Sequence, residues 1–205
     1  MTILRTSGKI KDEEHPFGTV LAYTLPALPP PSISQKELSS KLRDAVFAIG
    51  FDWGWFMVDF LVRNKEPIIL EISPRPGGDS LPDLIEIASG EDMLKMYLDM
   101  VSGNHRRPFE IPLGEKVLAS INLFASENGL VKEIDISEIK EMDYVQKVFI
   151  TRKINDQVLI PPYDYDSWKI GYCIVKVDPS TDLKETQKIL QERMALSIMD
   201  FPDHL

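Results

Sequence analysis

The sequence predicts an α+β fold in which antiparallel sheets are combined with helices. Residues 56–62 and 68–73 are apolar runs rich in β-branched and aromatic side chains, and the short polar turn between them is typical of a hairpin. Apolar side chains then recur at helical spacing over residues 35–49 and again after residue 80. The chain has 205 residues, 43% of them apolar, which is enough for one large domain or two small ones.

The composition excludes several classes of protein. The net charge of −9 and the absence of a Lys/Arg patch argue against a nucleic-acid surface. A single cysteine, Cys173, allows no internal disulfide and fits a reducing compartment. No apolar run reaches about 18 residues and no signal-peptide pattern opens the chain, so we expect a cytoplasmic protein with no membrane contact. Neither a P-loop nor a Gly-x-Gly-x-x-Gly turn is present, so a nucleotide would need another kind of site.

The first elements are a strand and a helix. Residues 17–25 predict the strand, and the proline-rich run 26–31 predicts an extended connector because proline cannot continue a sheet. Ser34 and Glu37 have the spacing of a capping box, which opens a helix that ends at Gly50. The apolar stripe of this helix consists of Leu38, Leu42, Ala45, Val46 and Ile49.

The predicted hairpin brings two acidic side chains together. If its turn is centred on Lys65, Asp59 pairs directly with Glu71. One face then holds Val58, Phe60, Val62, Ile68, Leu70 and Ile72, and the other holds Met57, Asp59, Leu61, Ile69, Glu71 and Ser73. Opposed carboxylates repel each other unless a cation lies between them, and Mg²⁺ prefers carboxylate oxygens. The alternative is a solvated sheet face whose acids point into water.

A basic residue and a diglycine follow the hairpin. Arg75 could clamp a phosphate or a carboxylate with its bidentate fork. Gly77 and Gly78 let the backbone approach a ligand, and the start of the next helix, capped by Asp79 or Ser80, offers free N–H groups to an anion. The alternative is that both glycines only make a turn that needs positive φ.

The remainder of the chain predicts a second, smaller unit. Another helix ends at Gly103, so we expect one subdomain over residues 1–103 and a linker over residues 104–115. Residues 116–205 predict a small α+β subdomain without recognisable catalytic residues. Its expected strands are 116–124, 130–136, 144–152 and 168–177, and its closing helix is lined by Leu183, Thr186, Leu190 and Met194. Cys173 lies in one of these strands and is expected to be a buried, inert thiol.

The hairpin and the residues after it resemble the metal-binding end of the ATP-grasp superfamily. That family has an acidic residue on one strand and Glu-x-Asn-x-Arg on the next, and this chain has Asp59 and then Glu71-Ile72-Ser73-Pro74-Arg75. The continuation Pro76-Gly77-Gly78-Asp79 is similar to the L-amino-acid ligase and carboxylate–amine ligase branch. The fold implied is the C-terminal part of an ATP-grasp module, followed by the small α+β subdomain.

The resemblance also implies roles for single residues. Asp59 and Glu71 would hold the magnesium ions of MgATP, with Ser73 as a weaker metal ligand where the family usually has asparagine. Arg75 would stabilise the transferring phosphoryl group or the acyl phosphate, as the catalytic residue. Leu61 resembles the apolar floor under the adenine, although simple packing explains it equally well. Gly77 and Gly78 complete the expected cofactor contacts.

The activity implied is amide-bond formation through an acyl phosphate, from MgATP, a carboxylate such as an amino acid, and an amine. Fewer than 60 residues precede Asp59, too few for the first half of the ATP-grasp fold. We therefore expect a fragment, half of a split enzyme or a degenerate domain, inactive alone, whose partner is the N-terminal half in cis or in trans. A homodimer is possible through an apolar surface around Met57, Leu61 and Ile69. The rival hypothesis is a non-catalytic, grasp-derived domain that binds a partner or a metabolite.

Overall fold

The computed structural model describes residues 3, 5–13, 19–28, 30–104 and 117–201. They form an α+β fold of helices and antiparallel sheets, as predicted. The chain divides into two compact units, one made of residues 1–8 and 25–115 and the other of residues 9–24 and 116–205. No helix in the described ranges is long and apolar enough to cross a membrane.

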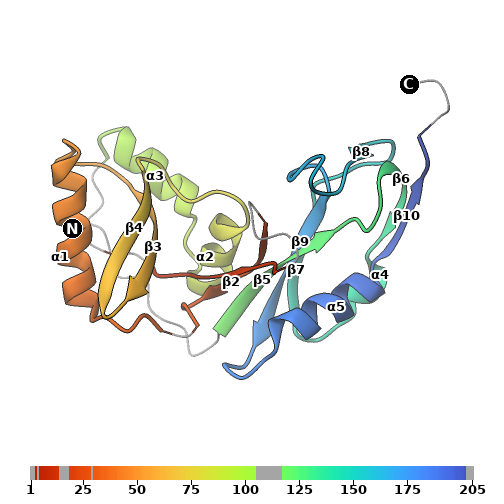
Figure 1. Cartoon of the computed structure of the whole chain (residues 1–205), viewed down its shortest axis with the longest axis horizontal. Helices are drawn as coiled ribbons and strands as arrows, with labels where there is room; N and C mark the ends of the chain where they lie inside the picture. The colour runs from red at the N-terminus through yellow and green to blue at the C-terminus, as the bar shows by residue number, and fades with distance from the viewer. Residues whose placement is uncertain (1–2, 4, 14–18, 29, 105–116, 202–205) are drawn as a thin grey trace. The chain divides into compact units, whose positions relative to one another are not determined.

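The first unit combines a hairpin with three helices (Figure 1). Its elements are α1 (Gln35–Ala48), β3 (Met57–Arg63), β4 (Glu66–Ser73), α2 (Leu81–Ser89) and α3 (Met93–Val101). The capping box of α1 is present, because Ser34 Oγ accepts a hydrogen bond from the Glu37 N–H and the Glu37 carboxylate accepts one from the Ser34 N–H. Leu38, Leu42 and Val46 are buried as the stripe predicts, whereas Ile49 is exposed.

The hairpin turn is shorter than the sequence suggested. Arg63 pairs with Glu66, so the turn contains only Asn64 and Lys65, whose φ values are 53° and 63°. Two successive residues with positive φ are typical of the tight turns whose twist matches that of a hairpin. Asparagine tolerates this conformation well.

A β-bulge shifts the strand register by one residue between the turn and the two acidic side chains. Phe60 pairs with Ile69, but Asp59 pairs with Glu71, so Leu70 is the extra residue of the bulge. The predicted pairing of Asp59 with Glu71 is therefore confirmed. The predicted faces were wrong for Ile68 and Ile69, because the prediction placed the centre of the turn on Lys65. The observed turn is centred between Asn64 and Lys65, so each pair between the turn and the bulge differs by one residue from the predicted pair.

The consequence is an exchange of two isoleucines between the faces of the hairpin. Ile68 lies opposite Leu61, on the face of Asp59, and its side chain is 44% exposed. Ile69 lies opposite Phe60 on the other face and is half-buried. Leu70 was expected on the apolar face, but it is exposed as the bulge residue.

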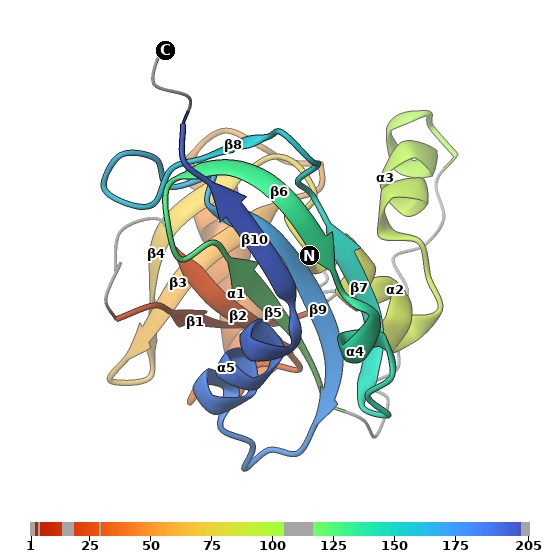
Figure 2. The same cartoon turned by 90° about the vertical axis from the view of Figure 1, so that its right-hand side faces the viewer.

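The second unit contains two sheets. A five-stranded sheet has the order β1 (Gly8–Lys11), β2 (Val20–Leu25), β5 (Val117–Phe124), β9 (Lys169–Val177) and β7 (Val145–Ile150). A three-stranded sheet has the order β10 (Ala195–Met199), β6 (Gly129–Asp135) and β8 (Gln157–Val158), and the helices are α4 (Ser137–Lys140) and α5 (Leu183–Arg193). In Figure 2, β10 and β6 lie in front of β9 and β5.

One hydrophobic core joins the two sheets and α5. It contains Ile121 of β5, Val131 of β6, Cys173 of β9 and Leu190 of α5, with Leu196 of β10 packed against it. Cys173 is fully buried, as expected, and burial raises the pKa of its thiol from 9.0 to about 12. The thiol is therefore protonated and unreactive at neutral pH.

The structure differs from the predicted domain boundaries at the N-terminus. Residues 9–24 do not belong with the hairpin but with the second unit, because β2 neighbours β5 in the five-stranded sheet. A strand pairing across so many residues leaves no local sequence signal. The predicted linker at residues 104–115 lies, except for Asn104, outside the described residues.

Candidate functional site

The two acids and the serine lie on one face of the hairpin. Asp59 on β3 and Glu71 on β4 are directly paired, and the Cβ atoms of such neighbours are about 4.5–5.5 Å apart. Glu71 is exposed and Asp59 is half-buried. Ser73 lies two residues beyond Glu71, and its Oγ donates a 2.5 Å hydrogen bond to Glu71 Oε1. The face therefore offers oxygen ligands from three side chains.

These ligands suit a hard divalent cation only in part. No group of three or more His, Cys, Asp and Glu side chains that could hold a metal occurs among the described residues. Mg²⁺, however, is usually held by one or two carboxylates together with waters and the phosphates of a substrate. Two carboxylates and a hydroxyl therefore fit Mg²⁺ that arrives with a phosphate-bearing ligand, and they do not form a complete protein cage.

An exposed apolar surface lies next to the acids. Leu61 lies two residues after Asp59 on the same strand face and is 58% exposed, and its cross-strand neighbour Ile68 shares this exposure. We call Leu61 and Ile68 the apolar step of the hairpin. Exposed apolar side chains beside polar ligands are typical of a surface on which another group packs.

Arg75 is held close to the strand end that carries Glu71. Its backbone N–H donates to Ser73 O at 2.8 Å, and its Nη1 donates to Pro76 O at 2.9 Å. The side chain is exposed. A guanidinium has five N–H donors, so after this one side-chain hydrogen bond most of its donors can still bind an anion.

The diglycine does not make a positive-φ turn. Neither Gly77 nor Gly78 has a positive φ, which removes that alternative, and Asp79 adopts a φ of 58° instead. A Cβ on Gly77 would approach Leu81 Cδ1 to 2.9 Å, so this glycine is needed for packing against α2. A Cβ on Gly78 would meet only Arg75 Nη1 at 3.7 Å, an ordinary contact, so packing does not require glycine there.

Ser80 is a feature whose role the sequence did not reveal. It is the N-cap residue of α2, but its side chain makes no capping hydrogen bond. The residue is fully buried, and its Oγ has no hydrogen-bond partner among the described residues. A buried hydroxyl without a partner calls for an explanation, and a bound polar ligand supplies one. The start of α2 also presents backbone N–H groups, which favour anions.

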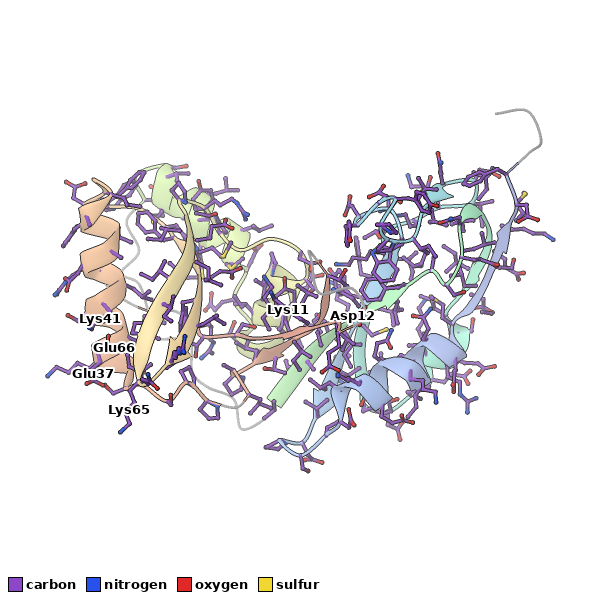
Figure 3. The ribbon with its side chains drawn as sticks, viewed as in Figure 1. Lys11, Asp12, Glu37, Lys41, Lys65 and Glu66 are labelled. Carbon is purple, nitrogen blue, oxygen red and sulfur yellow. The ribbon has the colours of Figure 1, made fainter. Side chains whose placement is uncertain are left out.

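The opposite end of the hairpin is a structural contact. Lys41 Nζ on α1 lies 2.8 Å from Glu66 Oε2 on β4, as Figure 3 shows. The hydrogen bond to Glu66 raises the pKa of Lys41, and the hydrogen bonds with Ser34 lower the pKa of Glu37. All of these side chains are exposed. They hold the hairpin tip against α1 and lie away from the paired acids.

Solved structures show which known fold this chain resembles. An L-amino acid ligase from Bacillus licheniformis matches with a TM-score of 0.68 and 17% identity, over 90% of this chain and 46% of the ligase. A phosphoribosylglycinamide synthetase from Anaerococcus prevotii matches with a TM-score of 0.70 and 20% identity, over 95% of this chain and 49% of the synthetase. Both are ATP-grasp enzymes. The chain has the fold of an ATP-grasp C-terminal half.

Further matches extend this likeness to another branch of ATP-grasp enzymes. A biotin carboxylase from Campylobacter jejuni, solved as an ATP complex, matches with a TM-score of 0.60 and 19% identity, over 94% of this chain and 45% of the carboxylase. The chain thus spans about half the length of the solved proteins that it matches. No family model and no curated protein matches the sequence. The likeness that these comparisons show is therefore one of fold.

Proposed function

We propose that this chain is the C-terminal portion of a MgATP-dependent carboxylate–amine ligase, with an amino acid as the carboxylate or the amine. The observation that carries the proposal is the direct pairing of Asp59 with Glu71 beside Arg75, within an ATP-grasp half. A solvated hairpin face would not explain why a bulge restores this pairing against the register of the turn. The match to an L-amino acid ligase supports the amino-acid substrate.

The residues of the proposed site have different roles in phosphoryl transfer. Asp59 and Glu71, assisted by Ser73, would hold Mg²⁺, which when bound neutralises the phosphate charge of ATP. A carboxylate oxygen of the substrate attacks the γ-phosphorus, ADP leaves, and the amine then displaces phosphate from the acyl phosphate. Arg75 would stabilise the charge that develops on the transferring group.

The neighbouring surfaces fit the other parts of the substrates. The apolar step of Leu61 and Ile68 offers a floor for the adenine, beside the acids that would take the phosphates. Gly77 and Gly78 lie between Arg75 and the start of α2, where backbone can approach phosphate or carboxylate oxygens. The buried Ser80 hydroxyl supports this placement, because it needs a hydrogen-bond partner.

The N-terminal half of the ATP-grasp fold completes the enzyme in this proposal, in cis or in trans. The solved matches are about twice as long as the part that this chain covers. A nucleotide gains most of its affinity from enclosure, and this hairpin provides one wall. The other half would pack over the apolar step and enclose the adenine.

The decisive experiment joins or mixes this chain with an ATP-grasp N-terminal half and supplies MgATP, a carboxylate and hydroxylamine. Hydroxylamine traps an acyl phosphate as a hydroxamate, so its formation together with ADP release identifies the reaction class. Glu71→Gln should abolish both products, whereas the matched variant Glu66→Gln on the same strand should retain them. ATP binding without ADP release would favour the non-catalytic rival, and turnover by Glu71→Gln would overturn the assigned site.

A further inference from the structure

Two buried side-chain oxygens on β5 have no hydrogen-bond partner among the described residues. They are Oγ of Ser120 and Oδ1 of Asn122, and these residues are 0% and 2% exposed. Buried polar atoms in native proteins are nearly always hydrogen-bonded, because leaving one unpaired costs free energy. Both oxygens therefore need a partner that is enclosed together with them.

The two side chains share one face of the five-stranded sheet. Successive side chains of a strand alternate between its faces, and the neighbouring Ile121 and Leu123 belong to the hydrophobic core. Ser120 and Asn122 consequently lie on the face that is turned away from this core. Their positions are about 6.5–7 Å apart along the strand, which is short enough for one small group to bond to both oxygens.

The hydrogen bonds of Asn122 define what kind of group is missing. Its Nδ2 donates a 2.7 Å hydrogen bond to Val20 O, and a carbonyl oxygen can only accept. Oδ1 is therefore left as an acceptor that needs an N–H or O–H donor, and the hydroxyl of Ser120 can accept a second such bond. Thr19, which directly precedes Val20, contributes a third buried oxygen without a partner among the described residues, its Oγ1.

The neighbours across the sheet favour a donor that also carries carbon. On β9, Ile174 lies opposite Ser120 and Tyr172 lies opposite Asn122, and both are buried. Opposed Cβ atoms are about 4.5–5.5 Å apart, so a group held by the two oxygens would contact these side chains. A water molecule there would face an isoleucine and an aromatic ring, whereas a primary amine can turn its N–H groups to the oxygens and its carbon chain to the apolar side chains.

We propose that Ser120 and Asn122 bind the amino group of a primary amine. The N–H groups donate to Asn122 Oδ1 and Ser120 Oγ, and the carbon chain packs against Ile174 and Tyr172. A carboxylate–amine ligase must bind an amine, and we assign the site to that substrate. This assignment of a role rests on the proposed function, whereas the binding itself does not.

Nuclear magnetic resonance of the full chain with two isomeric cations tests the binding. n-Butylammonium has three N–H donors, whereas tetramethylammonium has the same formula and charge but no N–H group. n-Butylammonium should shift the backbone amide signals of residues 119–123 and the side-chain amide signal of Asn122, and tetramethylammonium should not. Equal shifts with both cations, or none with either, would overturn the proposal. A crystal structure grown with n-butylammonium that shows only water on the two oxygens would do the same.

Single substitutions test which atoms hold the amine. Ser120→Ala should raise the dissociation constant of n-butylammonium by about 10-fold, the usual size of one lost hydrogen bond to a charged group. Asn122→Leu should abolish the binding. Ser126→Ala removes an exposed hydroxyl just after β5 and is the matched control, which should bind like the native chain. Unchanged affinity in Ser120→Ala would contradict the proposal, and this variant decides alone if Asn122→Leu fails to fold.

Kinetics of the complete two-half enzyme test the assigned role. Ser120→Ala should raise KM for the amine substrate by about 10-fold and leave KM for ATP unchanged. Absence of hydroxamate formation by the native enzyme would refute the ligase, and with it the role, but it would not affect the binding of n-butylammonium. An active ligase whose KM for the amine is the same in Ser120→Ala would refute the role of this site alone.

Discussion

Asp59 lies directly opposite Glu71, although the strand register shifts by one residue immediately beside this pair. The two-residue turn would on its own bring Leu70 opposite Asp59. Because Leu70 is accommodated as a bulge, the carboxylate of Glu71 takes that position instead. Two like charges in direct opposition repel each other, and a magnesium ion held between them, as proposed above, would offset this repulsion.

In the complete two-half enzyme, Asp59→Asn and Glu71→Gln should weaken the binding of Mn²⁺ in the presence of ATP. Loss of one carboxylate ligand should lower the affinity by at least about 10- to 100-fold, which is the usual cost of losing a group that only supports a ligand. Ser73→Ala should have a smaller effect than either, because a neutral hydroxyl holds a cation less strongly. Electron paramagnetic resonance of free Mn²⁺ gives the measurement. The control is Glu66→Gln, which removes the same charge from the far end of β4; an equal loss there would point to general electrostatics.

Arg75→Ala should lower kcat of the complete enzyme by about 10²- to 10³-fold, the usual effect of removing one charge-stabilising donor. The folding of the hairpin should not change, because the side chain is exposed and, within the described part of the chain, its hydrogen bond is the one to Pro76 O. Steady-state kinetics give the measurement, with Arg63→Ala as a control for charge on the same hairpin. A rise in KM alone would assign Arg75 to ground-state binding instead of phosphoryl transfer.

The isolated 205-residue chain should fold cooperatively but should not catalyse. ATP would meet one wall of its cleft, so isothermal titration with MgATP should show weak binding and no amino acid should stimulate ADP release. Micromolar affinity together with amino-acid-dependent ADP production would show that this chain contains a complete active site.

Ser34→Ala should destabilise the first unit by about 0.5–2 kcal/mol, because Ser34 Oγ caps the Glu37 N–H at the start of α1. The Ser34 hydroxyl also donates to the Glu37 carboxylate at 2.7 Å and lowers its pKa, so this contribution is present above the ordinary carboxylate pKa and is lost as the pH falls below it. Urea melts at neutral and acidic pH give the measurement. Ser40→Ala, within the same helix, is the control, and an equal loss there would exclude a capping effect.

The thiol of Cys173 should make stability depend on alkaline pH. Burial raises its pKa from 9.0 to about 12, so the folded state keeps a proton that the unfolded state loses. The free energy of unfolding should therefore be unaffected by this group below about pH 9 and should fall between about pH 9 and 12. Denaturant melts of the native chain and of Cys173→Ala give the comparison. A parallel decline in both would mean that other groups cause it.

Local signals in the sequence predicted much of the fold. The capping box of Ser34 and Glu37, the turn near Lys65 and the alternation around Asp59 all act over a few residues, and each is present in the structure. The exposed positions of Ile68 and Leu70 could not be predicted, because a bulge depends on strand pairing as a whole and not on a residue pattern.

The features that could not be predicted from the sequence depend on contacts between residues far apart along the chain. The membership of residues 9–24 in the second unit follows from the pairing of β2 with β5, and no local pattern reports it. The sequence predicts Ser80 only as an ordinary helix cap, and its complete burial, with no hydrogen-bond partner for its hydroxyl among the described residues, is what suggests a role in the proposed site.

The bulge at Leu70 has a consequence for the detection of related chains. Asp59 and Glu71 are twelve positions apart, but with the same two-residue turn and no bulge, acids eleven positions apart would face each other in the same way. Spacing between the acids can thus change by one residue while their spatial relationship is preserved. A pattern search that demands a constant interval would overlook such chains, whereas a search that allows one inserted residue in the second strand would recover them.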